Sequence, residues 1–125
     1  MDKMLFVSGF VLGLSLFTAM TAENAVDVSK LPPPADKQGV TYATDINPIF
    51  QKTCVKCHGP EKQKANLRLD SLAAALKGSD NGPVIIPGDS ARSKVFHNIA
   101  RREAKGELTR EQIGLVRAWI DQGAK

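Results

Sequence analysis

The residues Cys54-Val55-Lys56-Cys57-His58 decide most of what this 125-residue chain can form. The pattern Cys-x-x-Cys-His is typical of covalent haem attachment. Its spacing has a chemical reason, because two thiols so placed can add to the two vinyl groups on one edge of a porphyrin. The adjoining imidazole then lies beneath the ring as an iron ligand. The motif therefore predicts one haem c per chain, attached to Cys54 and Cys57, with His58 as the proximal iron ligand.

Two other kinds of site use some of the same residues. A thioredoxin-like redox pair also has the spacing Cys-x-x-Cys, but it follows a strand in a βαβ unit, and nothing before Cys54 has the pattern of a buried strand. A structural zinc site needs four ligands, and the chain has Cys54, Cys57, His58 and the distant His97. Adjacent cysteine and histidine are an unusual pair of zinc ligands, so the residues favour haem over both alternatives.

The first residues have the composition of an export signal. Lys3 precedes an uncharged run over residues 4–22 that is rich in Leu, Phe, Val and Gly. We predict a signal peptide over residues 1–22, cleaved after Ala22. Met20 matches the Ala-x-Ala pattern poorly, however, and the run is long enough to remain as an N-terminal membrane anchor. Covalent haem attachment in bacteria takes place outside the cytoplasmic membrane, so both motifs predict a periplasmic or exported protein.

The rest of the chain divides into a tether and one domain. Residues 23–40 are polar, contain Leu31-Pro32-Pro33-Pro34 and show no apolar period, which predicts a flexible, extended tether. The remaining residues, 41–125, form one domain of about 85 residues, which can build only a modest core. A buried macrocycle would supply much of its apolar contact area, so we expect the haem-free protein to be poorly folded.

Helical periodicity recurs in this domain. Asp45 is predicted to cap a first helix that has Pro48 in its first turn, and Asp70 to cap a second helix that ends at Gly78. Asp89 or Ser90 can cap a third helix. Its apolar positions are Val95, Phe96 and Ile99.

The last helix has the clearest pattern. Thr109 and Gln112 have the spacing of a capping box, and Gly123 is placed to end the helix. Its expected buried face comprises Ile113, Val116, Trp119 and Ile120. Residues 84–86 are apolar but too few for a strand without a partner, so we expect a loop packed on the haem. These elements predict an all-α domain around one covalently bound haem.

Charge limits the classes of partner. The formal net charge of +4 is spread along the chain, without a basic run or interleaved aromatic residues, so we expect no nucleic-acid binding. Several lysines surround the haem motif, where they could steer acidic redox partner proteins or offset the haem propionates. They are Lys52, Lys56, Lys62 and Lys64. No nucleophile elbow, P-loop or zinc-hydrolase motif is present, so the residues indicate an electron-transfer protein and not an enzyme.

Nearly the whole predicted domain, residues 41–125, resembles the planctomycete-type cytochrome c domain. The residues that carry the resemblance are Asp45-Ile46-x-Pro48-Ile49, Cys54 to Pro60, Leu67-Arg68-Leu69-Asp70-Ser71, Gly82-Pro83-x-Ile85-x-Pro87-Gly88-Asp89-x-x-x-Ser93, Leu108-Thr109-x-Glu111-Gln112-Ile113 and Trp119 to Ala124. The resemblance implies a class I cytochrome c-like helical fold, a haem between the first and last helices, and electron transfer outside the cytoplasm. Trp119, Phe50 and the apolar loop would then exclude water from the haem and tune its potential.

The chain departs from this family at the distal iron ligand. Family members usually carry Met-Pro-Pro shortly before the Leu-Thr of the last helix, and that methionine binds the iron. This chain has residues 101–107, Arg-Arg-Glu-Ala-Lys-Gly-Glu, in that place, and its methionines are Met1, Met4 and Met20.

Three arrangements of the sixth iron position remain open. His97 could bind the iron, although helical spacing places it opposite the apolar stripe of its own helix. Lys105 could bind after losing its proton. In the third arrangement no protein side chain binds, and Arg102 lines an open distal pocket. The main hypothesis is thus an exported electron carrier. The alternative is a haem-based sensor of small ligands, or a weak peroxidase, with an open distal site.

Overall fold

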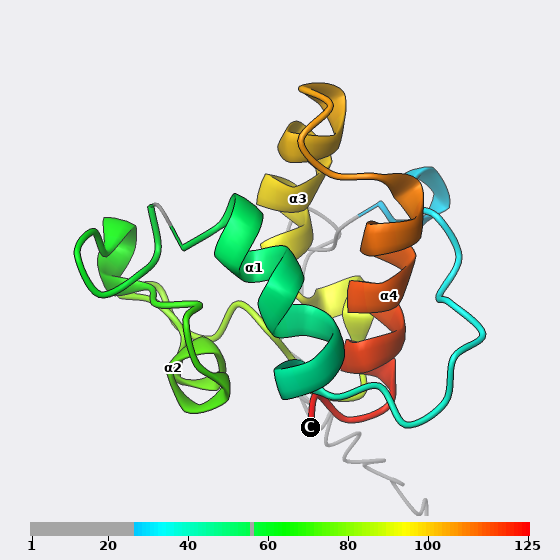
Figure 1. Cartoon of the computed structure of the whole chain (residues 1–125), viewed down its shortest axis with the longest axis horizontal. Helices are drawn as coiled ribbons and strands as arrows, with labels where there is room; N and C mark the ends of the chain where they lie inside the picture. The colour runs from blue at the N-terminus through cyan, green and yellow to red at the C-terminus, as the bar shows by residue number, and fades with distance from the viewer. Residues whose placement is uncertain (1–26, 56) are drawn as a thin grey trace, which may run out of the picture.

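The computed structural model describes residues 27–55 and 57–125, and in these residues the secondary structure is helical with no strand (Figure 1). The α-helices are α1 (Asn47–Thr53), α2 (Leu72–Lys77), α3 (Val95–Ala104) and α4 (Arg110–Asp121). Shorter helical turns are η2 (Val28–Lys30), η3 (Tyr42–Ile46), η4 (Lys64–Asn66) and η5 (Ser90–Arg92). The predicted all-α class is confirmed. The predicted export signal, residues 1–22, lies outside the described residues.

The helical chain that leads into α1 begins about one turn earlier than the sequence suggests. The π-helical turn η3 precedes α1, and Thr41 caps that turn by accepting a hydrogen bond from the Thr44 amide. Asp45, which the sequence predicts as the cap, lies inside the turn, accepts a hydrogen bond from the Thr41 amide and pairs with Lys37. The capping prediction for Asp45 is therefore wrong, because the chain turns helical four residues earlier. Pro48 does lie in the first turn of α1.

An aromatic cluster joins the beginning of the domain to its end. Trp119 on α4 is fully buried, and its ring centroid lies 6.0 Å from that of Tyr42 and 6.1 Å from that of Phe50. Figure 1 shows α1 and α4 side by side. The expected apolar face of α4 is confirmed, as Ile113, Val116, Trp119 and Ile120 are all 0% exposed. The Thr109 capping box is also present.

Helix α2 has a different cap from the expected one. Ser71, not Asp70, accepts the hydrogen bond from the Ala74 amide. Asp70 instead accepts two hydrogen bonds from the Arg68 guanidinium, at 2.9 and 2.6 Å. The helix ends at Gly78, whose φ of 85° explains why glycine stands there.

Helix α3 begins after a separate 3₁₀ turn. Asp89 caps η5 by accepting a hydrogen bond from the Arg92 amide, and α3 starts at Val95 without a side-chain cap. Val95, Phe96 and Ile99 are buried as predicted. The apolar segment 84–86 is a loop, in which Ile85 is buried. This loop and α3 form one wall of the cavity described below.

Part of the predicted tether packs against α4. Leu31 and Val40 are buried. Arg117 donates to the Pro32 carbonyl at 3.0 Å, and the Ala35 amide donates to the Gly114 carbonyl at 2.9 Å. The Gln122 side chain holds the other end of this segment. It accepts a hydrogen bond from the Val40 amide and donates one to the Lys37 carbonyl. We call residues 31–40 the strap. The part of the chain that packs against the domain therefore begins at Leu31, ten residues before the predicted domain start at residue 41.

The described helices are short. Within residues 27–55 and 57–125, none has the length and apolar character required to cross a bilayer.

Candidate functional site

The Cys-x-x-Cys-His motif forms a tight turn directly after α1. The Cys54 amide donates to the Phe50 carbonyl at 2.8 Å, which continues the helical pattern by one residue. The amides of Cys57 and His58 both donate to the Cys54 carbonyl, at 3.2 and 2.9 Å. The chain thereby folds back on itself within five residues, and the side chains of Cys54, Cys57 and His58 come to line the same cavity.

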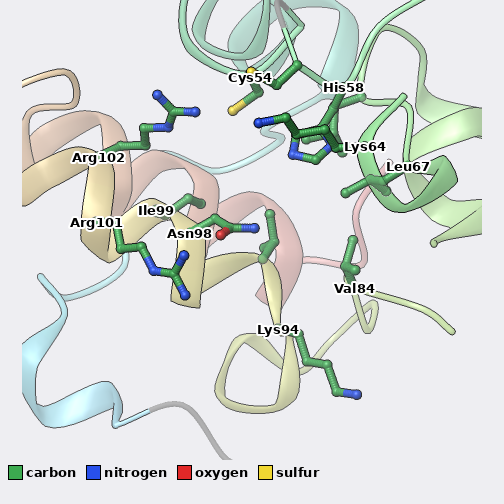
Figure 2. Close-up of a pocket in the computed structure, with 13 residues that line it drawn as sticks. Cys54, His58, Lys64, Leu67, Val84, Lys94, Asn98, Ile99, Arg101 and Arg102 are labelled. Carbon is green, nitrogen blue, oxygen red and sulfur yellow. The ribbon is translucent and has the colours of Figure 1, made fainter. Parts of the chain in front are cut away.

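This cavity has a volume of about 300 Å³, at the lower end of the range for cofactor sites. The motif and the segment 64–69 form one wall, and Val84 with one face of α3 forms the other (Figure 2). Its lining residues are Cys54, Cys57, His58, Lys64, Leu67, Leu69, Val84, Lys94, Val95, Asn98, Ile99, Arg101 and Arg102. The motif thus faces a helix about 40 residues away in the sequence.

His58 has the protonation state that iron binding requires. Burial lowers the pKa of its imidazole, although the nearby backbone carbonyls of Lys64 and Leu67 oppose this effect. The ring is therefore neutral at neutral pH and has a free nitrogen lone pair. Its Nδ1 is buried and has no hydrogen-bond partner. A buried imidazole nitrogen without a hydrogen-bond partner is costly in isolation. Iron bound to one ring nitrogen, with a hydrogen-bond partner for the other, would relieve that cost.

The two cysteines are free thiols in different surroundings. Cys54 is buried, which raises the pKa of its thiol, while hydrogen bonding by Thr53 and the charge of Arg102 oppose the shift. Cys57 is half-buried. Figure 2 shows the Cys54 sulfur on the same side of the cavity as the His58 ring. Two thiols and one imidazole on one wall fit covalent haem attachment.

The two competing kinds of site gain no support from this geometry. The motif follows helix α1 and not a strand, which is the wrong context for a thioredoxin-like pair. In the described part of the chain, no group of three or more His, Cys, Asp or Glu side chains is arranged to hold a metal ion. His97, the fourth ligand that zinc would need, is exposed on α3 and does not line the cavity.

The expected distal candidates lie away from the cavity. His97 is exposed, as its position opposite the stripe of Val95 and Ile99 predicts. Lys105 is exposed at the C-cap of α3, and it does not line the cavity either. Arg102, the residue expected beside an open distal site, does line it. Neither His97 nor Lys105 is therefore brought to the face opposite His58.

Sequence reasoning missed several residues of the cavity, namely Lys94, Asn98 and Arg101. Asn98 and Arg102 follow Val95 by three and seven positions, so helical spacing from the apolar stripe could have placed both on the cavity side of α3. Lys64, one of the lysines that the sequence places around the haem motif, reaches the cavity from the 3₁₀ turn η4.

The implied place of the haem between the first and last helices stays a prediction. No described residue of α4 lines the cavity, and neither does Phe50. Trp119 and Phe50 are instead buried against Tyr42, with edge-to-face geometry between their own rings. These two rings fill the core on which α1 packs, and their expected part in excluding water from the haem stays a prediction.

The part of the chain that lines this cavity matches a known protein family. Residues 54–107 match the family Planctomycete cytochrome C. The match confirms the resemblance seen in the sequence, and it spans every residue that lines the cavity. A match to a cytochrome c family implies covalently bound haem and, at a coarse level, haem-based electron transfer. No curated protein and no solved structure matched the chain.

Proposed function

We propose that this chain is an exported electron carrier with one haem c, attached to Cys54 and Cys57 and bound through its iron to His58. The observation that carries the proposal is the shared cavity, in which two free thiols and a neutral imidazole line one wall. Each thiol would add across one vinyl group, the sulfur to one carbon and the hydrogen to the other. This addition consumes no oxidant or reductant.

The haem would supply the one-electron chemistry, and the protein would hold and orient it. His58 is anchored through its backbone on both sides, since its amide donates to Cys54 and its carbonyl accepts from the Leu69 amide at 2.7 Å. Leu67, Leu69, Val84, Val95 and Ile99 supply apolar surface that excludes water. A low dielectric of this kind favours whichever iron state has the smaller charge, and so tunes the reduction potential.

The proposed export and partner rest on the sequence and on the charge of the cavity. Residues 1–22 have the composition of a signal peptide, and the uncharged run 4–22 would serve as the membrane tether if it is retained. Lys64, Lys94, Arg101 and Arg102 line the cavity, and no carboxylate does so among the described residues. Positive charge at that place supports an acidic redox partner protein.

The test is to produce the full chain with a cytochrome c maturation system. We expect haem that remains attached in denaturing electrophoresis, and reversible reduction and reoxidation at an electrode. Cys54→Ala and Cys57→Ala should each leave one thioether bond, and the double variant should lose covalent haem. A wild-type chain that carries haem but cannot be cycled between its two redox states would rule out an electron carrier.

A second function is favoured by the wall opposite His58. The described residues on that wall include no methionine and no histidine. We propose as the alternative an open distal iron site that binds small ligands, in a haem-based sensor or a weak peroxidase. A ferrous spectrum that shifts under carbon monoxide would support it, and a low-spin spectrum that ignores carbon monoxide would exclude it.

A further inference from the structure

One face of α3 forms the wall opposite the haem motif. Val95, Asn98, Ile99 and Arg102 all line the cavity, and their spacing of three, four and seven residues places them along a single stripe of the helix. Val95 and Ile99 are buried, whereas Asn98 is exposed and the Arg102 side chain is 31% exposed. The stripe therefore has two apolar residues and, beside them, two hydrogen-bond donors.

The guanidinium of Arg102 is fixed beside the motif. Its Nη1 donates to Glu107 Oε2 at 2.7 Å, and the Glu107 amide donates to the Arg102 carbonyl at 2.9 Å. In Figure 2 this guanidinium reaches toward the Cys54 sulfur, whereas the side chain of Arg101 points away from it. Hydrogen bonds to Glu107 and to Cys57 raise the pKa of the Arg102 guanidinium. Arginine has five N–H donors, so further donors remain for a ligand.

The charges around the cavity have one sign. Four cationic side chains line it, as described above, and the Glu107 carboxylate lies outside that lining. Glu107 instead lines a neighbouring cavity of about 370 Å³, which Arg102 and Cys57 also line. A small cavity with low-dielectric walls and net positive charge concentrates anions.

We propose that Arg102 and Asn98 form a distal binding site for small anions that coordinate the ferric iron of a haem held by His58. The inference rests on the proposed function, because it requires that haem. Binding is a ligand exchange at the iron and transfers no electron. Arg102 donates a charge-assisted hydrogen bond to the anion, and Asn98 donates a neutral one from its amide. An open iron with these donors binds anions in preference to neutral ligands of similar strength.

The experiment titrates the ferric, haem-loaded full chain with azide as the anionic probe and imidazole as the neutral probe, and follows the visible spectrum. We expect Arg102→Leu to weaken azide binding by about tenfold to a hundredfold, since charge-assisted hydrogen bonds have this magnitude. Asn98→Ala should weaken it by about twofold to tenfold, as expected for a neutral hydrogen bond. Neither variant should weaken imidazole binding. Arg102→Lys should retain part of the azide affinity.

The matched control is Arg110→Leu. Arg110 also pairs with a glutamate, Glu103, at 3.0 Å, and it does not line the haem cavity. Its replacement removes the same charge from a place outside the cavity. Azide affinity should therefore stay unchanged. The proposal is overturned if Arg102→Leu weakens azide no more than this control, or weakens imidazole equally. It is also overturned if the wild-type ferric spectrum is low-spin and neither probe shifts it, because a protein side chain then binds the iron.

Covalent haem and reversible reduction are measured in every variant, which separates the two proposals. Intact haem and normal redox cycling with no dependence of azide binding on Arg102 would overturn the anion site alone. Loss of covalent haem in the wild-type chain would overturn both. Asn98 is exposed on a helix, so its variant gives an independent reading if Arg102→Leu matures poorly.

Discussion

Gly114 on α4 faces the backbone of Pro33 so closely that a Cβ at position 114 would lie 2.8 Å from the Pro33 carbonyl oxygen. The contact is between backbone segments, so no flexible side chain can move aside. The adjacent hydrogen bond from the Ala35 amide to the Gly114 carbonyl depends on the same close approach. The strap therefore packs on α4 only because residue 114 has no side chain.

Gly114→Val should displace the strap from α4. We expect the free energy of unfolding to fall by about 1–3 kcal/mol, as for other overpacked sites, because the valine forces the Pro33 backbone away. Thermal unfolding and limited proteolysis of residues 31–40 measure the change. Ala100→Val, at an exposed position of α3, controls for the β-branched residue in a helix. Unchanged protease resistance of residues 31–40 would contradict the prediction.

Trp119→Phe should destabilise the fold without altering the haem spectrum. Trp119 Nε1 donates to the Lys125 carbonyl at 3.0 Å, and phenylalanine loses this hydrogen bond and part of the contact with Tyr42 and Phe50. The expected loss is about 1–3 kcal/mol, measured by denaturant unfolding followed by circular dichroism. Since Trp119 does not line the cavity, the visible spectrum should keep its maxima. A shifted spectrum would show that Trp119 contacts the haem.

The sequence was most informative where one residue type has one local role. The capping box at Thr109, the C-terminal Gly78 of α2 and the apolar face of α4 follow from spacing alone, because helical geometry fixes which positions meet. Caps were harder to place where two candidates are adjacent. Asp70 and Ser71 can both cap a helix, and the neighbouring Arg68 decides between them by binding the aspartate.

The missed features depend on contacts between distant segments. The strap has no apolar period, and it is held by Gly114, Arg117 and Gln122, which lie more than 70 residues away. The cavity also depends on contacts between segments that are distant in the sequence. His58 and the cysteines could be predicted from one motif, but the opposite wall became known only when α3 was placed against it.

Asp70 should make stability depend on pH in the acid range. The Arg68 guanidinium lowers the pKa of the Asp70 carboxyl in the folded protein. The pair therefore stabilises the fold above the unfolded-state pKa of about 3.9, and this contribution is lost as the pH falls through the lower folded-state value. The Arg68 side chain is 40% exposed, so solvent screens the pair and we expect a modest effect.

Asp70→Asn removes this titration. Its stability, measured by thermal unfolding from neutral pH downward, should approach that of the wild type as the medium becomes acidic, and should be lower at neutral pH. Asp80→Asn serves as the control, since Asp80 accepts a hydrogen bond from the neutral Asn66 amide and not from a cation. A constant difference between Asp70→Asn and the wild type at every pH would show that the ion pair does not contribute.

Gly59→Ala should reduce covalent haem attachment, because the residue after His58 has no room for a side chain. A Cβ there would clash with the Val55 carbonyl oxygen, so the turn that brings Cys54, Cys57 and His58 together would have to open. Haem attachment requires all three side chains to meet one porphyrin, and a displaced imidazole or thiol lowers its yield. The haem content per chain, measured by absorbance after denaturing purification, should fall severalfold.

The control for this prediction is Gly39→Asn. Gly39 has φ of 65° and no heavy atom within 4 Å of an added Cβ, and asparagine tolerates this conformation. Its haem content should equal that of the wild type. A Gly59→Ala chain with full haem content would show that the turn relaxes around the haem. In that case the cofactor, and not the polypeptide before attachment, would set the geometry of the motif.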